Sequence, residues 1–270
     1  MRIADWIHLA VFAFLVVLAI ARSLPRARRL KIIGIGAVGL SVTLASTQLD
    51  RVFAPLTVSV IRDWLPAPLM LLVYWQAGKF FVRVQEDFQR RLARLDERLV
   101  APLLLALARR SFGRGILVYL ELAYLLCYPM IPLSMAAIYL LRMGREADRF
   151  WAVVLPATYA CYVMVPFAQM LPPRLIEERW NAPLPQSPLR VLNLGILRHA
   201  SIHANTFPSA HVAASLSSAL ALIQLDLRVG LVFLCAAVSI SLGAVLGRYH
   251  YAADAILGAA VALSAFAIAW

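Results

Sequence analysis

Two short polar segments interrupt the otherwise apolar C-terminal part of the chain. The first, TFPSAH, places Ser209 and His211 directly after a proline, and the second, GRYHYAAD, contains Arg248, His250 and Asp254. If His250 and Asp254 lie on one helix, a spacing of four residues places both side chains on the same face. The carboxylate would then hold one ring nitrogen of the imidazole and leave the other as a nucleophile toward phosphorus.

His211 has no carboxylate at that spacing, which suits a general acid that protonates a leaving oxygen. Arg174, which follows Leu-Pro-Pro, could stabilise charge on phosphate oxygens together with Arg248. Ser209 begins a segment whose helical N–H groups could bind an anion. We therefore predict a phosphoryl-transfer site that uses no metal or cofactor. Its catalytic residues are His211, His250 and Asp254, and its phosphate-binding residues are Arg174, Ser209 and Arg248.

Some of these polar residues also have simpler interpretations. Arg174 could be an anchor at a membrane boundary, and Ser209 could be only a helix cap. Tyr249 and Tyr251 are interpreted as aromatic residues of the membrane interface. Glu121 lies inside an apolar run. The sequence is equally compatible with a functional role for this acid and with a structural, hydrogen-bonded one.

A zinc site is a further alternative, because His199 and His203 also stand four residues apart. With His211 they would supply three ligands. However, no further cysteine or carboxylate has ligand spacing, so we expect no metal there.

The elements that must position these residues are membrane helices. Of the 270 residues, 62% are hydrophobic and 15% are charged, whereas a soluble domain carries about 25% charged residues. Six apolar runs approach the roughly 20 residues needed to span a bilayer: Ile7–Ala21, Ile32–Leu49, Ile116–Leu141, Phe150–Leu171, Val229–Gly247 and Ala252–Trp270. Trp64–Val82 and Phe207–Leu225 are weaker candidates. We predict an all-α integral membrane protein with about eight membrane-associated helices.

The order of these runs predicts three regions. Residues 1–50 form a pair of transmembrane helices, and because a basic cluster follows the first run we expect no cleaved signal peptide. Residues 51–115 contain a proline-broken span and an amphipathic helix, over 83–110, that either lies on the membrane surface or links two spans in solvent. Residues 116–270 form the catalytic core. Within it, residues 172–206 are expected to be a loop that partly covers the site.

The formal net charge of +12 does not indicate a nucleic-acid partner, because the basic residues lie at the ends of the apolar runs and on residues 83–110. The expected partners are membrane lipids and a lipid phosphate, and the sequence leaves the oligomeric state open.

The basic residues also bear on the membrane topology. With eight spans, 19 of the 26 Lys and Arg residues lie on the side of the candidate site. The positive-inside rule would make that side cytosolic.

FPSAH followed by HYAAD resembles the second and third motifs of the phosphatidic acid phosphatase type 2 (PAP2) superfamily, and VPFAQMLPPRL resembles a proline-rich form of the first. The resemblance implies a six-helix core, Arg174 as the first-motif arginine, His250 as nucleophile and His211 as acid. The family lysine would fall at Phe167, the glycine of the second motif at Ala210 and the third-motif arginine at Ala244. With these differences the chain resembles the inositolphosphotransferase-like branch of the superfamily, in which the lysine is commonly missing.

The resemblance implies a membrane lipid phosphate or diphosphate phosphatase that works through a phosphohistidine. Two alternatives stay open. One is a phosphotransferase that moves a phosphorylated headgroup to an alcohol, and the other is a non-catalytic transporter. The resemblance also implies a bacterial cytoplasmic membrane with the site on the extracytoplasmic side, opposite to the side that the charge count favours.

Overall fold

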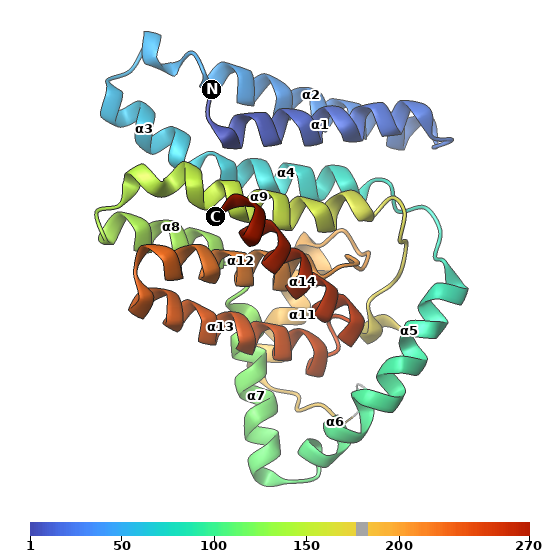
Figure 1. Cartoon of the computed structure of the whole chain (residues 1–270). Coiled ribbons are helices and arrows are strands. Elements are labelled where there is room, and N and C mark those ends of the chain that lie inside the picture. Colours follow the sequence, from blue (N-terminus) through green and yellow to red (C-terminus); the bar gives the residue numbers. More distant parts are fainter. Residues whose placement is uncertain (177–182) are drawn as a thin grey trace.

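The computed structural model describes residues 1–176 and 183–270, and in these residues the regular structure is helical, with no strand. Figure 1 shows the helices in chain order. They are α1 (Ile3–Ala21), α2 (Arg26–Ser46), α3 (Pro55–Trp64), α4 (Pro66–Gly78), α5 (Glu86–Leu99), α6 (Ala101–Ala108), α7 (Ser111–Leu125), α8 (Met130–Leu140), α9 (Ala147–Met164), α11 (Pro188–Ala200), α12 (Ala210–Leu225), α13 (Leu227–Leu246) and α14 (Ala252–Ala269).

Several helices are long and apolar enough to cross a membrane, so the chain is an integral membrane protein. Among the described residues five pass by length and composition: α1, α2, the Pro55–Gly78 segment formed by α3 and α4, α13 and α14. A bent pair, α7 and α8, would raise the number to six. The two other expected spans are helical but do not pass. α12 has 16 residues, and α9 carries Asp148 and Arg149 in its first turn.

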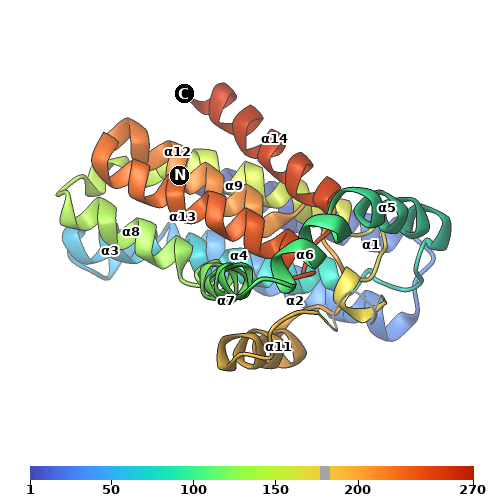
Figure 2. The ribbon, with the colours of Figure 1, turned by 90° about the horizontal axis from the view of Figure 1, so that it is seen from below.

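The run Ile116–Leu141, expected to be one straight span, is instead two helices bent by 69°. Pro129 stands at the break, where it cannot donate a helical hydrogen bond and disfavours helical backbone at Tyr128. α7 therefore turns away from the direction of its neighbours (Figure 1), and in Figure 2 it is seen nearly end-on while α12 and α13 run across the view. As a result, the C-terminal end of α7 lies beside the candidate site.

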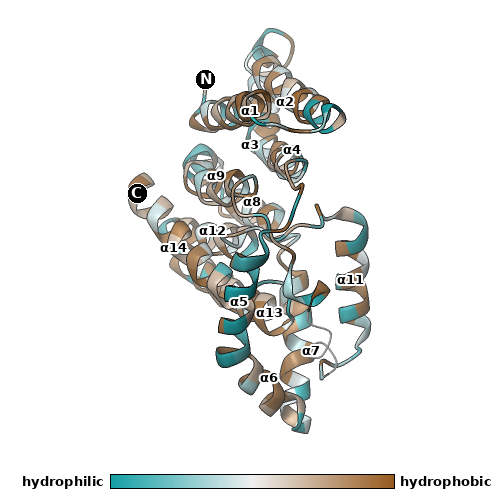
Figure 3. Cartoon of the chain, turned by 90° about the vertical axis from the view of Figure 1, so that its right-hand side faces the viewer, coloured by the Kyte–Doolittle hydropathy of each residue, from teal (hydrophilic) through white to brown (hydrophobic). Residues whose placement is uncertain are grey.

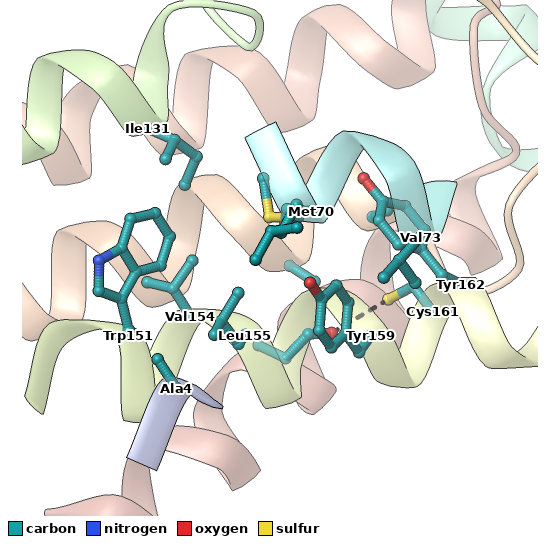
Figure 4. Packing of buried hydrophobic residues seen from close by; sticks show 14 of the residues in the cluster. Ala4, Met70, Val73, Ile131, Trp151, Val154, Leu155, Tyr159, Cys161 and Tyr162 are labelled. Carbon is teal, nitrogen blue, oxygen red and sulfur yellow. Dashed lines mark hydrogen bonds between the residues drawn. The ribbon is translucent and has the colours of Figure 1, made fainter. Parts of the chain in front are cut away.

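The principal core forms around α9, which packs against α1, α4, α12 and α14. Figure 4 shows this packing around Trp151, Val154, Leu155 and Tyr159, all of which are buried. Such burial on many sides fits a helix surrounded by other helices rather than one with a wide lipid-facing surface. α9 can therefore carry more polar residues than a lipid-facing span.

α12 and α14 approach each other closely near their N-terminal ends, next to the two candidate motifs. Gly258 of α14 faces the backbone of Ser209, and a Cβ atom at Gly258 would lie 2.6 Å from the Ser209 carbonyl oxygen. The Ser209 amide donates to the Asp254 carbonyl at 2.9 Å. The absence of a side chain at Gly258 thus lets the two segments come into backbone contact.

The charged and looped segments separate into two ends of the bundle. At one end, the Gln85 amide donates to Gln169 O at 2.8 Å, and Arg22 Nη1 donates to Pro166 O at 2.5 Å. At the other end, the Ile3 amide donates to Asp148 at 3.1 Å. The loops after α1, α4 and α9 therefore meet on one side, as the charge count assumed.

Two predicted segments differ from the structure. Residues 83–110 form two helices that meet at Val100, and Figure 3 shows the hydrophilic surface on α5 rather than on apolar α6. The expected loop 172–206 contains the 13-residue helix α11. Ser187 caps α11 by accepting from the Arg190 amide at 3.2 Å, and Pro188 occupies its first turn. Glu177 and Glu178 of this segment lie outside the described residues.

Candidate active site

The described parts of the predicted motifs meet at one cavity with an empty volume of about 390 Å³. Its lining comes from the start of α12, the segments before α12 and before α14, the ends of α7 and α11, the middle of α4 and the loop after α9. Arg174, Asn205, His211, Tyr249 and His250 are among the lining residues. Three distant parts of the chain that carry the predicted chemistry therefore share one space.

The two histidines of the prediction are neighbours in this cavity. The ring centroids of His211 and His250 are 5.7 Å apart, and the ring planes meet at 74°. Both rings can therefore contact one small group held in the cavity, which is the geometry that a nucleophile and an acid require.

Asp254 orients His250 as predicted, although by a different local structure. Asp254 Oδ2 lies 3.3 Å from His250 Nδ1 and also accepts from the Tyr251 amide at 3.0 Å. His250 is not helical: Tyr251 is the N-cap of α14 and Asp254 is the third residue of its first turn. The expectation that one helical face carries both residues is therefore wrong, because the chain turns into the helix between them.

Asn205 completes this arrangement. Its side-chain amide donates to Asp254 Oδ2 at 2.6 Å, and its backbone amide donates to Met170 O at 2.8 Å. Asn205 is buried. The sequence prediction missed it, although it stands immediately before TFPSAH in a chain where buried amides are costly unless they are paired.

Arg174 brings positive charge to the cavity. Its backbone amide donates to Arg248 O at 3.0 Å, and Nη1 lies 3.5 Å from Tyr249 O. Burial, and then the charge of Arg174, lower the pKa of the His250 imidazole to about 3. The cavity thus favours a neutral imidazole beside a cation, a combination that suits an anionic ligand.

Ser209 and Arg248 lie close to the cavity but are not among its described lining residues. Ser209 is buried and caps α12, since its side chain accepts from the Val212 amide at 3.5 Å. Arg248 is buried too, and its Nη1 donates to Asp96 Oδ2 at 2.9 Å. Phosphate binding by these two residues remains a prediction, and each has a structural partner.

Tyr249 and Tyr251 are buried, so their interpretation as membrane-interface aromatics is wrong. Tyr249 stacks on Tyr124 with ring centroids 3.9 Å apart and 5° between the planes. Its hydroxyl donates to Glu121 Oε2 at 2.5 Å. The third-motif segment is thereby tied to α7, and the bend after α7 makes this possible.

Glu121 also holds α11 over the site. Arg190 Nη1 donates to Glu121 Oε1 at 2.7 Å and to the Gly247 carbonyl at 3.2 Å, and Asn193 Nδ2 donates to Glu121 Oε2 at 2.9 Å. All three polar side chains are buried. Glu121 is therefore a structural acid that links α7, α11 and the third-motif segment.

A comparison with models of protein families shows which family the chain belongs to. A family model described as the PAP2 superfamily matches residues 90–268, which is about two thirds of the chain. The chain belongs to the PAP2 superfamily. No curated protein and no solved structure matches it.

The PAP2 match contains every described residue of the cavity except Tyr74 of α4. It begins inside α5 rather than at residue 116, where the predicted catalytic core begins, and it leaves α1–α4 outside. PAP2 membership supports phosphatase-type chemistry in general, and the arrangement of His211, His250 and Asp254 is how this chain could perform it.

The histidine pair outside the PAP2 motifs is not among the described residues that line this cavity. His199 and His203 are exposed, and the His199 ring contacts the Gly195 carbonyl at 2.8 Å. In the described parts of the chain, no group of three His, Cys, Asp or Glu residues has a geometry that could hold a metal ion.

Proposed function

We propose that this PAP2 protein hydrolyses a lipid phosphate or diphosphate through a phosphohistidine at His250. The observation that carries the proposal is the pair of imidazoles, His211 and His250, on one cavity with Asp254 behind the second ring. Arg174 supplies the positive charge that a phosphate needs. The first residues of α12 line the same cavity, and a helix N-terminus favours an anion.

The reaction follows from the ring orientation. Because Nδ1 of His250 faces Asp254, its Nε2 attacks phosphorus, the bond from phosphorus to the leaving oxygen breaks, and His211 gives that oxygen a proton. Water then attacks the phosphohistidine while His211 takes up its proton. The phosphorus–nitrogen bond breaks and phosphate leaves. Asp254 stabilises the positive charge that forms on the His250 ring in each step.

An apolar groove supports a substrate with a hydrocarbon chain. The groove, with an empty volume of about 640 Å³, is lined by Leu71, Trp75, Ile196 and Ala200 among others. It shares Tyr74, Tyr162, Leu197, Ser201 and His211 with the catalytic cavity. A lipid could therefore place its phosphate between the histidines and its chain between α4 and α11.

A phosphotransferase of the inositolphosphotransferase-like type is the second candidate. Tyrosines line much of the catalytic cavity, and Leu197 and Ser201, at the end of α11, line it as well. A covered cavity with hydroxyl groups suits an alcohol acceptor that must compete with water. In this reaction the alcohol, rather than water, attacks the phosphohistidine, and His211 takes the alcohol proton.

The test uses purified protein in lipid vesicles. It is given phosphatidate, a prenyl diphosphate, or a phosphodiester headgroup donor with an added alcohol. Release of phosphate supports the phosphatase, headgroup transfer supports the phosphotransferase, and solute flux without turnover supports a transporter. The His250→Ala and His211→Ala variants should each lose at least about 10³-fold in kcat, in the range seen when one catalytic residue is removed. Exposed His203→Ala is the matched control, and full turnover by His250→Ala would exclude the mechanism.

For the membrane topology we propose an extracytoplasmic site, which the family resemblance favours and the basic loops oppose. A cysteine placed at Pro188, at the start of α11, should react with a membrane-impermeant maleimide in intact cells. Labelling only after the cells are opened would place the site in the cytosol.

A further inference from the structure

The amphipathic helix α5 lies against both histidine-bearing segments. Phe88, Leu92 and Asp96 stand four residues apart and so share one face of the helix. Phe88 packs edge-to-face on Phe207, with ring centroids 5.0 Å apart, and Leu92 packs in a buried cluster with Tyr251. One face of α5 thus contacts the residue before Pro208 and the residue after His250.

The third member of this face is a carboxylate with no exposure to solvent. Asp96 Oδ2 accepts from Arg248 Nη1 at 2.9 Å, and Asp96 Oδ1 accepts from the Ala252 amide at 3.0 Å. The two contacts lie two residues before and two residues after His250. A single carboxylate therefore holds both sides of the short segment that carries the proposed nucleophile.

The backbone of that segment needs such support. Arg248 has a φ of 64°, a left-handed conformation that a side-chain-bearing residue keeps only where its surroundings impose it. Burying a charged pair is costly, and the pair often stabilises a fold no better than apolar residues would. The Asp96–Arg248 pair is distinguished by its place, because it holds the residue with the left-handed backbone two positions before His250.

We propose that Asp96 is a positioning residue that sets His250 toward the substrate through Arg248 and the Ala252 amide. The inference rests on the proposed function, because it assigns Asp96 a role in the reaction at His250. It goes beyond the motif residues, since Asp96 lies on another helix and about 150 positions before the third-motif segment in the chain.

The kinetic test compares Asp96→Ala and the shape-preserving Asp96→Asn with Asp87→Asn, an exposed acid on the same helix. Asp96→Ala should lose about 10²-fold in kcat, the cost of a small misplacement of reacting groups. Its KM should change by less than about threefold, because Arg174 and the groove still bind the substrate. Asp96→Asn should lose less, since it keeps an acceptor for the Ala252 amide, and Asp87→Asn should match the wild type.

A double variant separates positioning from general damage. If Asp96 acts largely through Arg248, the variant that combines Asp96→Ala with Arg248→Ala should be little slower than Arg248→Ala alone. If the losses in kcat of the two single variants multiplied in the double variant, or if Asp96→Ala changed only KM, the proposal would be overturned.

A second measurement does not depend on turnover. Diethyl pyrocarbonate modification, followed peptide by peptide by mass spectrometry, reports how well His250 is held and covered. His250, which is 5% exposed, should react slowly in the wild type and Asp87→Asn proteins, and at least about tenfold faster in Asp96→Ala and Asp96→Asn. Exposed His203 should react equally in all of them.

The activity assay and the modification assay together distinguish a failure of the proposed function from a failure of the inference about Asp96. A wild-type protein inactive on every substrate would count against the proposed function, while faster modification of His250 would still support positioning by Asp96. Unchanged modification in Asp96→Asn, measured on protein that elutes as the wild type does, would overturn the inference whatever the activity.

Discussion

Asn205 and His250 contact the same oxygen of Asp254. The Asn205 amide donates to Oδ2 at 2.6 Å, and His250 Nδ1 lies 3.3 Å from that atom. The orientation of the imidazole is thus determined by a residue 45 positions earlier in the chain, which reaches the carboxylate from the segment before α12.

Asn205→Ala should lower kcat by roughly 10-fold to 100-fold. Removing a hydrogen bond to a charged group costs about 1.5–3 kcal/mol, and 1.4 kcal/mol corresponds to a factor of ten. The carboxylate would then be free to turn away from His250. Initial rates in vesicles provide the measurement, with the nearby exposed His203→Ala as control. A variant with full activity would show that Asp254 holds its position without Asn205.

Lowering the pH should destabilise the fold through His250. The pKa of this imidazole is about 3 in the folded protein, below its ordinary value of 6.5, because of burial and then the charge of Arg174. Between these two values the unfolded chain binds a proton that the folded chain does not, so stability falls as the pH decreases through this window. Thermal unfolding in detergent should therefore show a larger loss from pH 6.5 downward for the wild type than for His250→Gln. If the wild type and His250→Gln lost the same stability as the pH fell, His250 would not be the group responsible for the loss.

Glu121→Ala should destabilise the protein by about 3–5 kcal/mol, because breaking a buried ion pair leaves the Arg190 charge without its carboxylate. Tyr249 and Asn193 would lose the same partner. Thermal unfolding measures the change, and Glu86→Ala, an exposed acid paired with Arg90 within α5, is the control. A fall in activity without a fall in stability would instead indicate that Glu121 acts in the reaction.

Gly258→Ala should reduce both stability and kcat, since its Cβ would lie 2.6 Å from the Ser209 carbonyl oxygen. Overpacking of this kind costs about 1–3 kcal/mol, and here the backbone shift would separate Ser209 from Asp254. Gly34→Ala in α2 is the matched control, because a Cβ there meets no atom within 4 Å. Equal behaviour of the two variants would show that α12 and α14 can move apart freely.

Ala200→Trp should fill the apolar groove and raise KM for long-chain substrates by roughly tenfold, while soluble short-chain phosphates are converted as before. The expectation follows from the position of Ala200 in the groove lining and from the roughly 0.8 kcal/mol that each buried methylene contributes. Ala106→Trp, on the exposed surface of α6, is the control for added aromatic surface. An unchanged chain-length preference would place the lipid chain elsewhere.

The sequence by itself determined the class of protein and the residues to which the proposed chemistry is assigned. Apolar length predicted membrane helices, because a bilayer requires a minimum run, and the polar motifs stood out because polar groups are costly in such a chain. His211, His250 and Arg174 were predicted and do line one cavity, with Asp254 behind His250. These inferences needed only local composition, spacing and the resemblance of three short motifs to a known superfamily.

Tertiary structure decided what holds the site in place. Asp96, Glu121 and Asn205 reach the histidine segments from α5, from α7 and from the segment before α12. The bend after α7 lies next to the contacts of Glu121, and the close approach of Gly258 to Ser209 lies next to those of Asp254. Spacing along the chain cannot predict such partners, because they depend on which helices pack side by side. A lone buried acid looks the same in sequence whether its counter-charge is four or 150 residues away.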